Sequence, residues 1–294
     1  MTNISINTAS DFTDALQKLS EFNQNYHASA QEHQSHLTKP ARSLGKLEEI
    51  ATWLAGWHNN KNPTIDHAVC IVFAANHGVA AQGVSAFPAE VTAQMVENFE
   101  NGGAAINQLT NLAGAKLKVV AMDLNNPTND FTKSPAMTEK ECCQAIQIGA
   151  NAVPENADIL LLGEMGIANT TSAAAVTLST FGGSVKDWVG YGTGISDQSY
   201  ILKQKVVTKA FELHQKKQKT SFDILRTVGG RELAAIAGAV LEARYRRIPV
   251  LLDGFISTAA AAVLLKDNRM ALDHALVSHI SVELGHQRLI KMIE

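Results

Sequence analysis

The chain has 294 residues, of which 46% are hydrophobic, 18% are charged and 6% are aromatic, and its formal net charge is −3. This composition belongs to a folded protein with a substantial core and argues against a disordered chain. Because the chain has no general excess of positive charge, nucleic acid is a poor candidate for a partner.

Residues 1–65 are predicted to form the N-terminal helical part of a small domain. Apolar residues recur three and four apart in 12–22 and 44–57, which is typical of amphipathic helices. The polar first residues lack the pattern of a signal peptide, and no apolar run is long enough to span a membrane. The three cysteines form no spaced framework. We therefore expect a cytoplasmic protein without membrane contact.

Residues 66–294 alternate between short apolar segments and helical patterns. Strands are expected within 67–79, 115–124, 157–166, 248–256 and 275–281. Strands that are apolar throughout and alternate with helices are typical of a parallel sheet covered on both faces. The sequence therefore predicts an α/β fold, with a Rossmann-like parallel sheet, helices on both of its faces and a smaller helical domain.

The loops after the expected strands form the candidate binding site. They read AANHGVAAQGVSAFP, GEMGIANTT, GYGTGISD, VGGRE, LDGFIS and SHISVE. Ligands of such folds gather at the carboxyl ends of the strands, where glycine lets the backbone come close and helix N-termini attract anions. We expect a pocket for a phosphate and a sugar, although each glycine alone is equally compatible with a simple turn.

Several enzyme classes lack their signatures in this chain. There is no Walker A motif, G-x-G-x-x-G, G-x-S-x-G or H-E-x-x-H. A nucleotide hydrolase, a nicotinamide-dependent dehydrogenase, a serine hydrolase and a zinc peptidase are therefore disfavoured. The histidines are scattered, and for His77 and His279 a hydrogen-bonding role is favoured over metal binding.

Two charged residues of this rim have alternative interpretations. Lys203 follows GYGTGISD, and we expect it on a polar helix face, where it is either a solvated lysine or a point charge on a phosphate. Glu164 ends the LLLGE strand. It is either a surface glutamate or a carboxylate that faces a cationic group, a hydroxyl or a ring N–H of the ligand.

Seven stretches resemble those of a known family in their order and spacing. They are KPARSLGKLEEIA, FAANHGVAAQGVSAFPAEVTAQMV with NGGAAINQL, GEMGIANTTSAAA, VGGRELAAIAGAVLEAR, PVLLDGFIS and SHISVELG, and they span about residues 39–285. In these stretches the chain resembles the nicotinate-nucleotide–dimethylbenzimidazole phosphoribosyltransferase family.

The resemblance implies a homodimer and a specific reaction. A nitrogen of 5,6-dimethylbenzimidazole attacks the anomeric carbon of nicotinate mononucleotide, nicotinate leaves, and α-ribazole 5′-phosphate is formed for the lower ligand of cobamides. No cofactor and no metal are expected, because the pyridinium ring becomes neutral as it departs.

The resemblance also implies roles for individual residues. Glu164 and Gly166 match the loop that touches the ribose and the phosphate. Gly192 and Lys203 match further phosphate contacts, and Ser281 matches another contact on the rim. The turn with Asn169 and Thr170 is expected to start a helix beneath the phosphate.

The chain also departs from the family pattern. Asn76 precedes His77 where the family usually has aspartate, and Ala41 and Arg42 stand in the segment that usually reads KPPGSLG. The family continues into a glycine-rich C-terminal motif whose glutamate is the proposed general base.

No such motif occurs among these 294 residues, and neither Glu283 nor Glu294 matches it. We therefore expect a truncated chain, a damaged gene product or a variant with another base, for which Glu164 is the first candidate. Two functions stay open: a phosphoribosyltransferase with reduced activity, and a non-catalytic homologue that binds a nucleotide or an azole.

Overall fold

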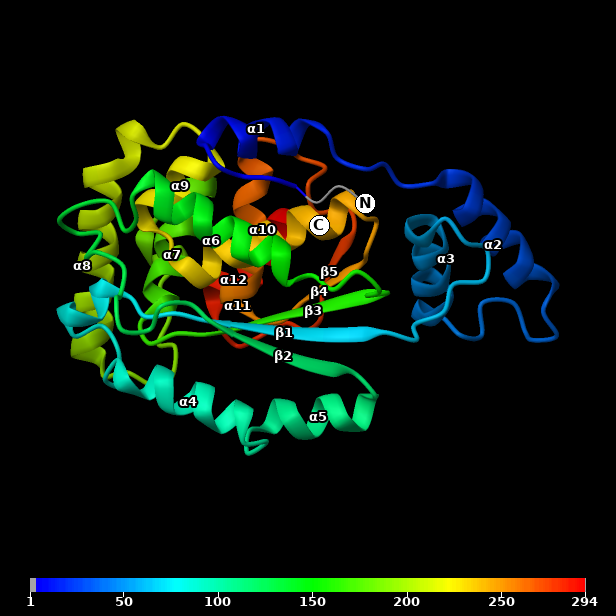
Figure 1. Ribbon diagram of the computed structural model, residues 1–294, viewed down its shortest axis with the longest axis horizontal. Helices are drawn as coiled ribbons and strands as arrows, with labels where there is room; N and C mark the ends of the chain where they lie inside the picture. Colours follow the sequence, from blue (N-terminus) through cyan, green and yellow to red (C-terminus); the bar gives the residue numbers. More distant parts are fainter. Residues whose placement is uncertain (1–3, 294) are drawn as a thin grey trace.

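The computed structural model describes residues 4–293 and contains one five-stranded parallel sheet (Figure 1). Its strand order is β2-β1-β3-β4-β5. The bounds are β1 (Ala68–Ala74), β2 (Lys116–Ala121), β3 (Ile159–Met165), β4 (Val250–Leu252) and β5 (Ala275–Val277). The chain runs outward from β1 to β2 and then returns to β3 on the other side of β1, so the strand order reverses between β1 and β3. In open α/β sheets a ligand binds at such a reversal, outside the carboxyl ends of the strands.

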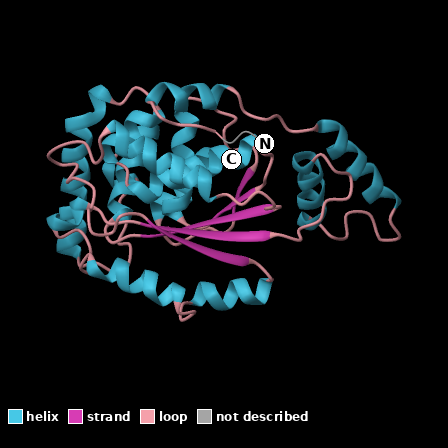
Figure 2. Ribbon diagram, viewed as in Figure 1, coloured by secondary structure: helices cyan, strands magenta, loops and turns pink. Residues whose placement is uncertain are grey.

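Helices cover both faces of the sheet, as Figure 2 shows. On one face lie α4 (Glu90–Glu100) and α5 (Ala105–Ala113). The other face carries α6 (Glu139–Ala152), α7 (Asn169–Phe181), α9 (Ser221–Val228), α10 (Arg231–Tyr245), α11 (Phe255–Ala262) and α12 (Leu284–Ile293), with α8 (Asp197–His214) at the end of this layer. The predicted Rossmann-like sheet with helices on both faces is therefore confirmed.

Helix α10 is the centre of the core, and glycine allows it to pack closely on α6. A Cβ atom on Gly149 would lie 1.8 Å from the Ala235 carbonyl oxygen, and one on Gly238 would lie 2.0 Å from that of Ile146. Only glycine fits at these crossings, so the two backbones touch. This contact fixes the N-terminus of α10 beside the carboxyl ends of β1 and β3.

The N-terminal helices divide between two places. Helices α2 (Gln24–His36) and α3 (Lys46–His58) form a pair at one side of the sheet (Figure 1). Helix α1 (Ala9–Gln17) instead lies on the α/β portion, where the rings of Phe12 and Phe222 are 5.9 Å apart. In the described range, no helix is both long enough and apolar enough to cross a membrane.

Candidate active site

The candidate site lies at the carboxyl ends of the strands, next to the reversal between β1 and β3. A cavity of about 190 Å³ opens there. Five of the residues predicted from the sequence line it, namely Glu164, Gly166, Asn169, Thr170 and Lys203. Its wall is completed by Val84, Ser85, Met165, Ile167, Ala168, Tyr191, Thr193, Ile195 and Ile256.

Glu164 lies at the end of β3, and its carboxylate accepts a hydrogen bond from the side-chain amide of Asn169. The pKa of Glu164 is raised to about 7, first by burial and then by the negative charges of Glu232 and Asp253, against the hydrogen bond from Asn169. A carboxyl group with a pKa near neutrality can both take up and release a proton, which is the property that a general base requires.

The turn after Glu164 needs glycine and opens onto a helix start. A Cβ atom on Gly166 would lie 2.7 Å from the Ala75 carbonyl oxygen, so the residue that follows β1 touches the turn after β3. Helix α7 begins at Asn169 without a side-chain cap. The preceding turn satisfies part of this N-terminus, since the N–H groups of Asn169 and Thr171 donate to the Gly166 and Ala168 carbonyl oxygens at 3.3 and 3.0 Å.

Lys203 is buried, and the expectation that it lies on a polar helix face is wrong. Only 1% of the residue is exposed, because α8 packs this side against the start of α7. Its Nζ donates hydrogen bonds to Thr170 Oγ1 at 2.8 Å and to the Gly190 carbonyl oxygen at 3.1 Å. Burial lowers the pKa of Lys203 to about 8, opposed by the charge of Glu283.

Gly192 lies beside this lysine, but its N–H points to a carboxylate of the protein. A Cβ atom on Gly192 would be 3.7 Å from Lys203 Nζ. Its backbone N–H donates to Glu283 Oε1 at 2.8 Å. The site therefore contains an internal anion next to the residues that were predicted to hold a phosphate.

Ser281 is turned away from this cavity. Its hydroxyl forms a hydrogen bond with His286 Nδ1 at 2.9 Å and accepts another from the Glu283 N–H at 3.3 Å. Ser281 thus holds the segment that carries Glu283, and it does not line the cavity around Lys203.

A second cavity, of about 200 Å³, meets the first at Glu164. Its wall is mostly apolar, with Cys70, Val72, Phe99, Ile106, Leu161, Leu162, Gly163, Leu251, Asp253 and Ser278 beside Glu164. Glu164 lines both cavities. A single carboxylate therefore faces the cavity that contains Lys203 and the start of α7 on one side, and a cavity lined mostly by apolar side chains on the other.

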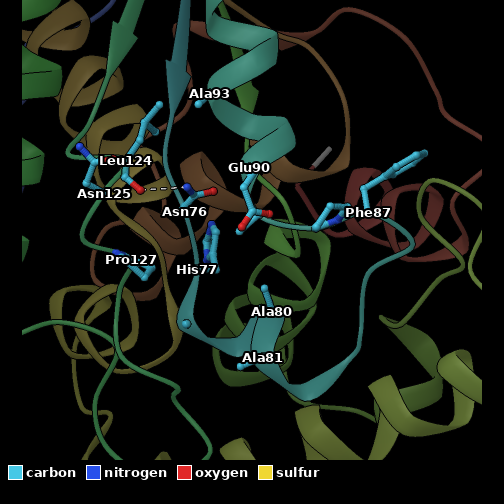
Figure 3. A pocket seen from close by; sticks show the side chains of 13 residues that line it. Asn76, His77, Ala80, Ala81, Phe87, Glu90, Ala93, Leu124, Asn125 and Pro127 are labelled. Carbon is cyan, nitrogen blue, oxygen red and sulfur yellow. Dashed lines mark hydrogen bonds between the residues drawn. The ribbon is translucent and has the colours of Figure 1, made fainter.

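A third cavity, of about 580 Å³, lies at the ends of β1 and β2 (Figure 3). Asn76 and His77 lie on one side of it, and Glu90 of α4 lies across from them. The Asn76 side chain donates to the Leu124 carbonyl oxygen at 3.0 Å. Neither Glu164 nor Lys203 lines this cavity.

The comparisons with known proteins agree on one family. A family model described as Phosphoribosyltransferase matches residues 19–294. A protein of Ruegeria sp. (strain TM1040), named nicotinate-nucleotide–dimethylbenzimidazole phosphoribosyltransferase, is 50% identical over 97% of this chain and 84% of its own length. One of the same name from Ruegeria pomeroyi is 53% identical over 90% of this chain and 78% of its own length. The chain belongs to the nicotinate-nucleotide–dimethylbenzimidazole phosphoribosyltransferase family.

The fold agrees with this assignment to the nicotinate-nucleotide–dimethylbenzimidazole phosphoribosyltransferase family. The crystal structure of CobT from Thermus thermophilus superposes with a TM-score of 0.83 at 36% identity, covering 92% of this chain and 86% of that one. The resemblance seen in the sequence is therefore confirmed, and the protein is a transferase of phosphoribosyl groups.

Sequence reasoning missed one pair of this phosphoribosyltransferase site. His77 and Glu232 are 155 positions apart, and their side chains meet at 2.5 Å in the interior. In the sequence, the only indication of a role for this pair is that His77 stands in the loop after an expected strand and Glu232 in the loop VGGRE. Within residues 4–293, no three histidine, cysteine, aspartate or glutamate side chains gather in an arrangement that could hold a metal ion.

Proposed function

We propose that the protein transfers the phosphoribosyl group of nicotinate mononucleotide to 5,6-dimethylbenzimidazole, giving α-ribazole 5′-phosphate and nicotinate. The observation that carries the proposal is the position of Glu164 between a cavity that contains a lysine and a helix start and a cavity lined mostly by apolar side chains. The two substrates differ in the same way, since one is a charged sugar phosphate and the other a flat apolar ring.

The nucleotide is assigned to the cavity that contains Lys203. Its phosphate would lie between the start of α7 and Lys203, where helix N–H groups and an ammonium group favour an anion. Thr170 holds Lys203 Nζ in this position. The ribose would then lie near Gly166, with its anomeric carbon facing Glu164.

The azole is assigned to the apolar cavity. Val72, Leu161 and Leu251 supply the hydrophobic surface that a dimethylated aromatic ring buries. In this position, the ring nitrogens would face Glu164.

The reaction needs the carboxylate of Glu164. The unprotonated azole nitrogen donates its electron pair to the anomeric carbon, while the bond to nicotinate breaks and its electron pair neutralises the pyridinium ring. The sugar gains positive charge in the transition state, and a nearby carboxylate stabilises that charge. The N–H proton of the other azole nitrogen passes to Glu164, the carboxylate that we propose as base.

The identity of the base is a separate part of the proposal. The 294 residues contain no match to the glutamate motif in which the family's base is expected. We propose that, within these 294 residues, Glu164 takes up the proton. A purely non-catalytic role is not favoured, because the relatives are named as the transferase.

We further propose a homodimer in the cytoplasm, with α2 and α3 in a separate small helical unit. The dimer and the unit rest on the family resemblance. Three free, buried cysteines support a reducing compartment. Light scattering at micromolar concentration tests the dimer, and a monomer at all concentrations would contradict it.

The test of the proposed function is an assay with nicotinate mononucleotide and 5,6-dimethylbenzimidazole. Chromatography follows nicotinate and the new nucleotide together. Equal amounts of both products are expected, and neither should form without the azole. Nicotinate release that does not depend on the azole would indicate a hydrolase and contradict the proposal.

A further inference from the structure

A buried histidine–glutamate pair lies behind the turn that follows Glu164. His77 Nε2 and Glu232 Oε1 are 2.5 Å apart, and neither side chain is exposed. His77 follows the end of β1, and Glu232 lies in the first turn of α10. The pair therefore sits at the reversal of the strand order, where ligands of this fold bind.

Two glycines of the rim make room for this pair. A Cβ atom on Gly230 would lie 2.2 Å from His77 Cε1 and 2.7 Å from Glu232 Oε2. A Cβ atom on Gly166 would lie 3.1 Å from Glu232 Oε1. Glu232 therefore contacts the backbone of the turn after Glu164, so a change in its position or charge reaches that turn directly.

The pair contains two buried polar atoms without partners in the described part of the chain. Glu232 Oε1 accepts the hydrogen bond, so the imidazole of His77 carries a proton on Nε2. His77 Nδ1 and Glu232 Oε2 are buried and have no hydrogen-bond partner within residues 4–293. Buried polar atoms without partners cost folding free energy, and such costs concentrate at functional sites.

The negative charge of Glu232 acts on Glu164. The charged groups around it are Glu232 from α10 and Asp253 after β4, and Asn169 from α7 supplies a neutral donor. After burial, Glu232 is the largest cause that raises the pKa of Glu164. Without this charge, Glu164 would give up its proton at lower pH and would be a weaker base.

We propose that His77 and Glu232 are positioning residues: His77 holds the carboxyl group of Glu232 behind the Gly166 turn, and Glu232 in turn keeps Glu164 able to take the proton from the azole. Neither residue touches a substrate. The inference rests on the proposed role of Glu164 as base, so its test must also work without turnover.

The first test follows the carboxyl group of Glu164 directly. Protein labelled with ¹³C at the glutamate carboxyl carbon is titrated by NMR without substrate, and E164Q assigns the signal. In E232Q, which keeps the shape of the side chain, the pKa of Glu164 should fall by about 1 unit or more, the usual effect of a neighbouring charge. The acid limb of the pH profile of kcat/KM should move to lower pH by the same amount, and the KM for the nucleotide should not change.

Glu242 provides a matched control on the same helix. It is also fully buried, and it accepts a hydrogen bond from the Ile4 backbone N–H at 2.9 Å, away from the cavities. E242Q removes a buried carboxylate from α10. It should leave unchanged both the pKa of Glu164 and the acid limb of the pH profile of kcat/KM.

An unshifted Glu164 signal in folded E232Q would overturn the inference. If E232Q does not fold, H77L removes the donor to Glu232 and should give the same downward shift, while H77Q keeps a donor and should restore the native value. A wild-type protein that forms no product contradicts the proposed function, but the titration still decides whether the pair acts on Glu164.

Discussion

Glu283 Oε1 accepts a hydrogen bond from the Gly192 N–H at 2.8 Å, so a side chain of the protein occupies a donor beside the predicted phosphate site. The same carboxylate raises the pKa of Lys203. Glu283 belongs to a segment with little apolar packing, because Val282 is 92% exposed and Leu284 is 68% exposed. A phosphate entering the cavity meets this negative charge.

The first prediction concerns competition between Glu283 and phosphate. E283Q should bind inorganic phosphate about tenfold more tightly, because removing a neighbouring like charge is worth about 1.4 kcal/mol per pKa unit of interaction. Isothermal titration calorimetry measures this directly. D197N, which neutralises an exposed rim carboxylate bonded to Tyr191, is the control. Weaker binding by E283Q would show that Glu283 supports the Gly192 turn and does not compete.

The second prediction concerns Lys203. K203M should weaken binding of nicotinate mononucleotide by about 1–3 kcal/mol, the scale of a charge-assisted hydrogen bond. K205M, on an exposed position of the same helix, is the control. Because Lys203 is buried, thermal unfolding must accompany the binding measurement. Unchanged affinity in a folded K203M would exclude a phosphate contact.

The third prediction is a pH dependence of binding. Phosphate attraction requires the ammonium form of Lys203, whose pKa is lowered to about 8 by burial. The affinity of the free protein for the nucleotide should therefore fall as the pH rises through about 8, and K203M should lose this fall. An affinity that stays constant from pH 7 to 9 in the wild type would contradict the assignment.

The fourth prediction concerns the transfer of the azole proton to Glu164. Glu164 must be ionised to act as base, and its pKa is raised to about 7, so kcat/KM should decline as the pH falls through about 7. E164Q should lower kcat by about 10²–10⁴-fold, the usual contribution of a positioned base. E90Q, which changes a carboxylate of the third cavity, should be near the wild type.

The fifth prediction concerns the family's C-terminal motif. Joining that segment of a relative to residue 294 should raise turnover by at least roughly 10²-fold, because a second carboxylate would then take the proton. Nucleotide affinity should change little, since the phosphate-binding turns are already present. Equal rates for the two proteins would mean that Glu164 serves fully as the base.

The sequence predicts the sheet well because each strand has a local signature. Segments such as 68–74 and 159–165 are apolar throughout and end in glycine-rich loops, which locates the strands and their carboxyl ends. Helix α2 has no comparable row of apolar residues, since Ala30 is its one buried residue. Its sequence therefore lacks the apolar spacing that indicates a helix. Local pattern therefore predicts elements that bury one face and misses those that do not.

The site is only partly predictable for a different reason. Glu164, Gly166 and Asn169 are neighbours in the chain, so their proximity follows from one strand and one turn. Lys203 is buried by the packing of α8 on α7, and His77 meets Glu232 across 155 positions. Such long-range contacts leave no periodic trace in a single sequence.

A crystal structure with nicotinate mononucleotide and a bound azole tests the central claim most directly. We expect the phosphate within hydrogen-bonding distance of Lys203 Nζ and the start of α7, the azole in the apolar cavity, and Glu164 between the ribose and the ring. A phosphate bound away from Gly166 and Lys203, or an azole in the cavity lined by His77 and Glu90, would contradict the account.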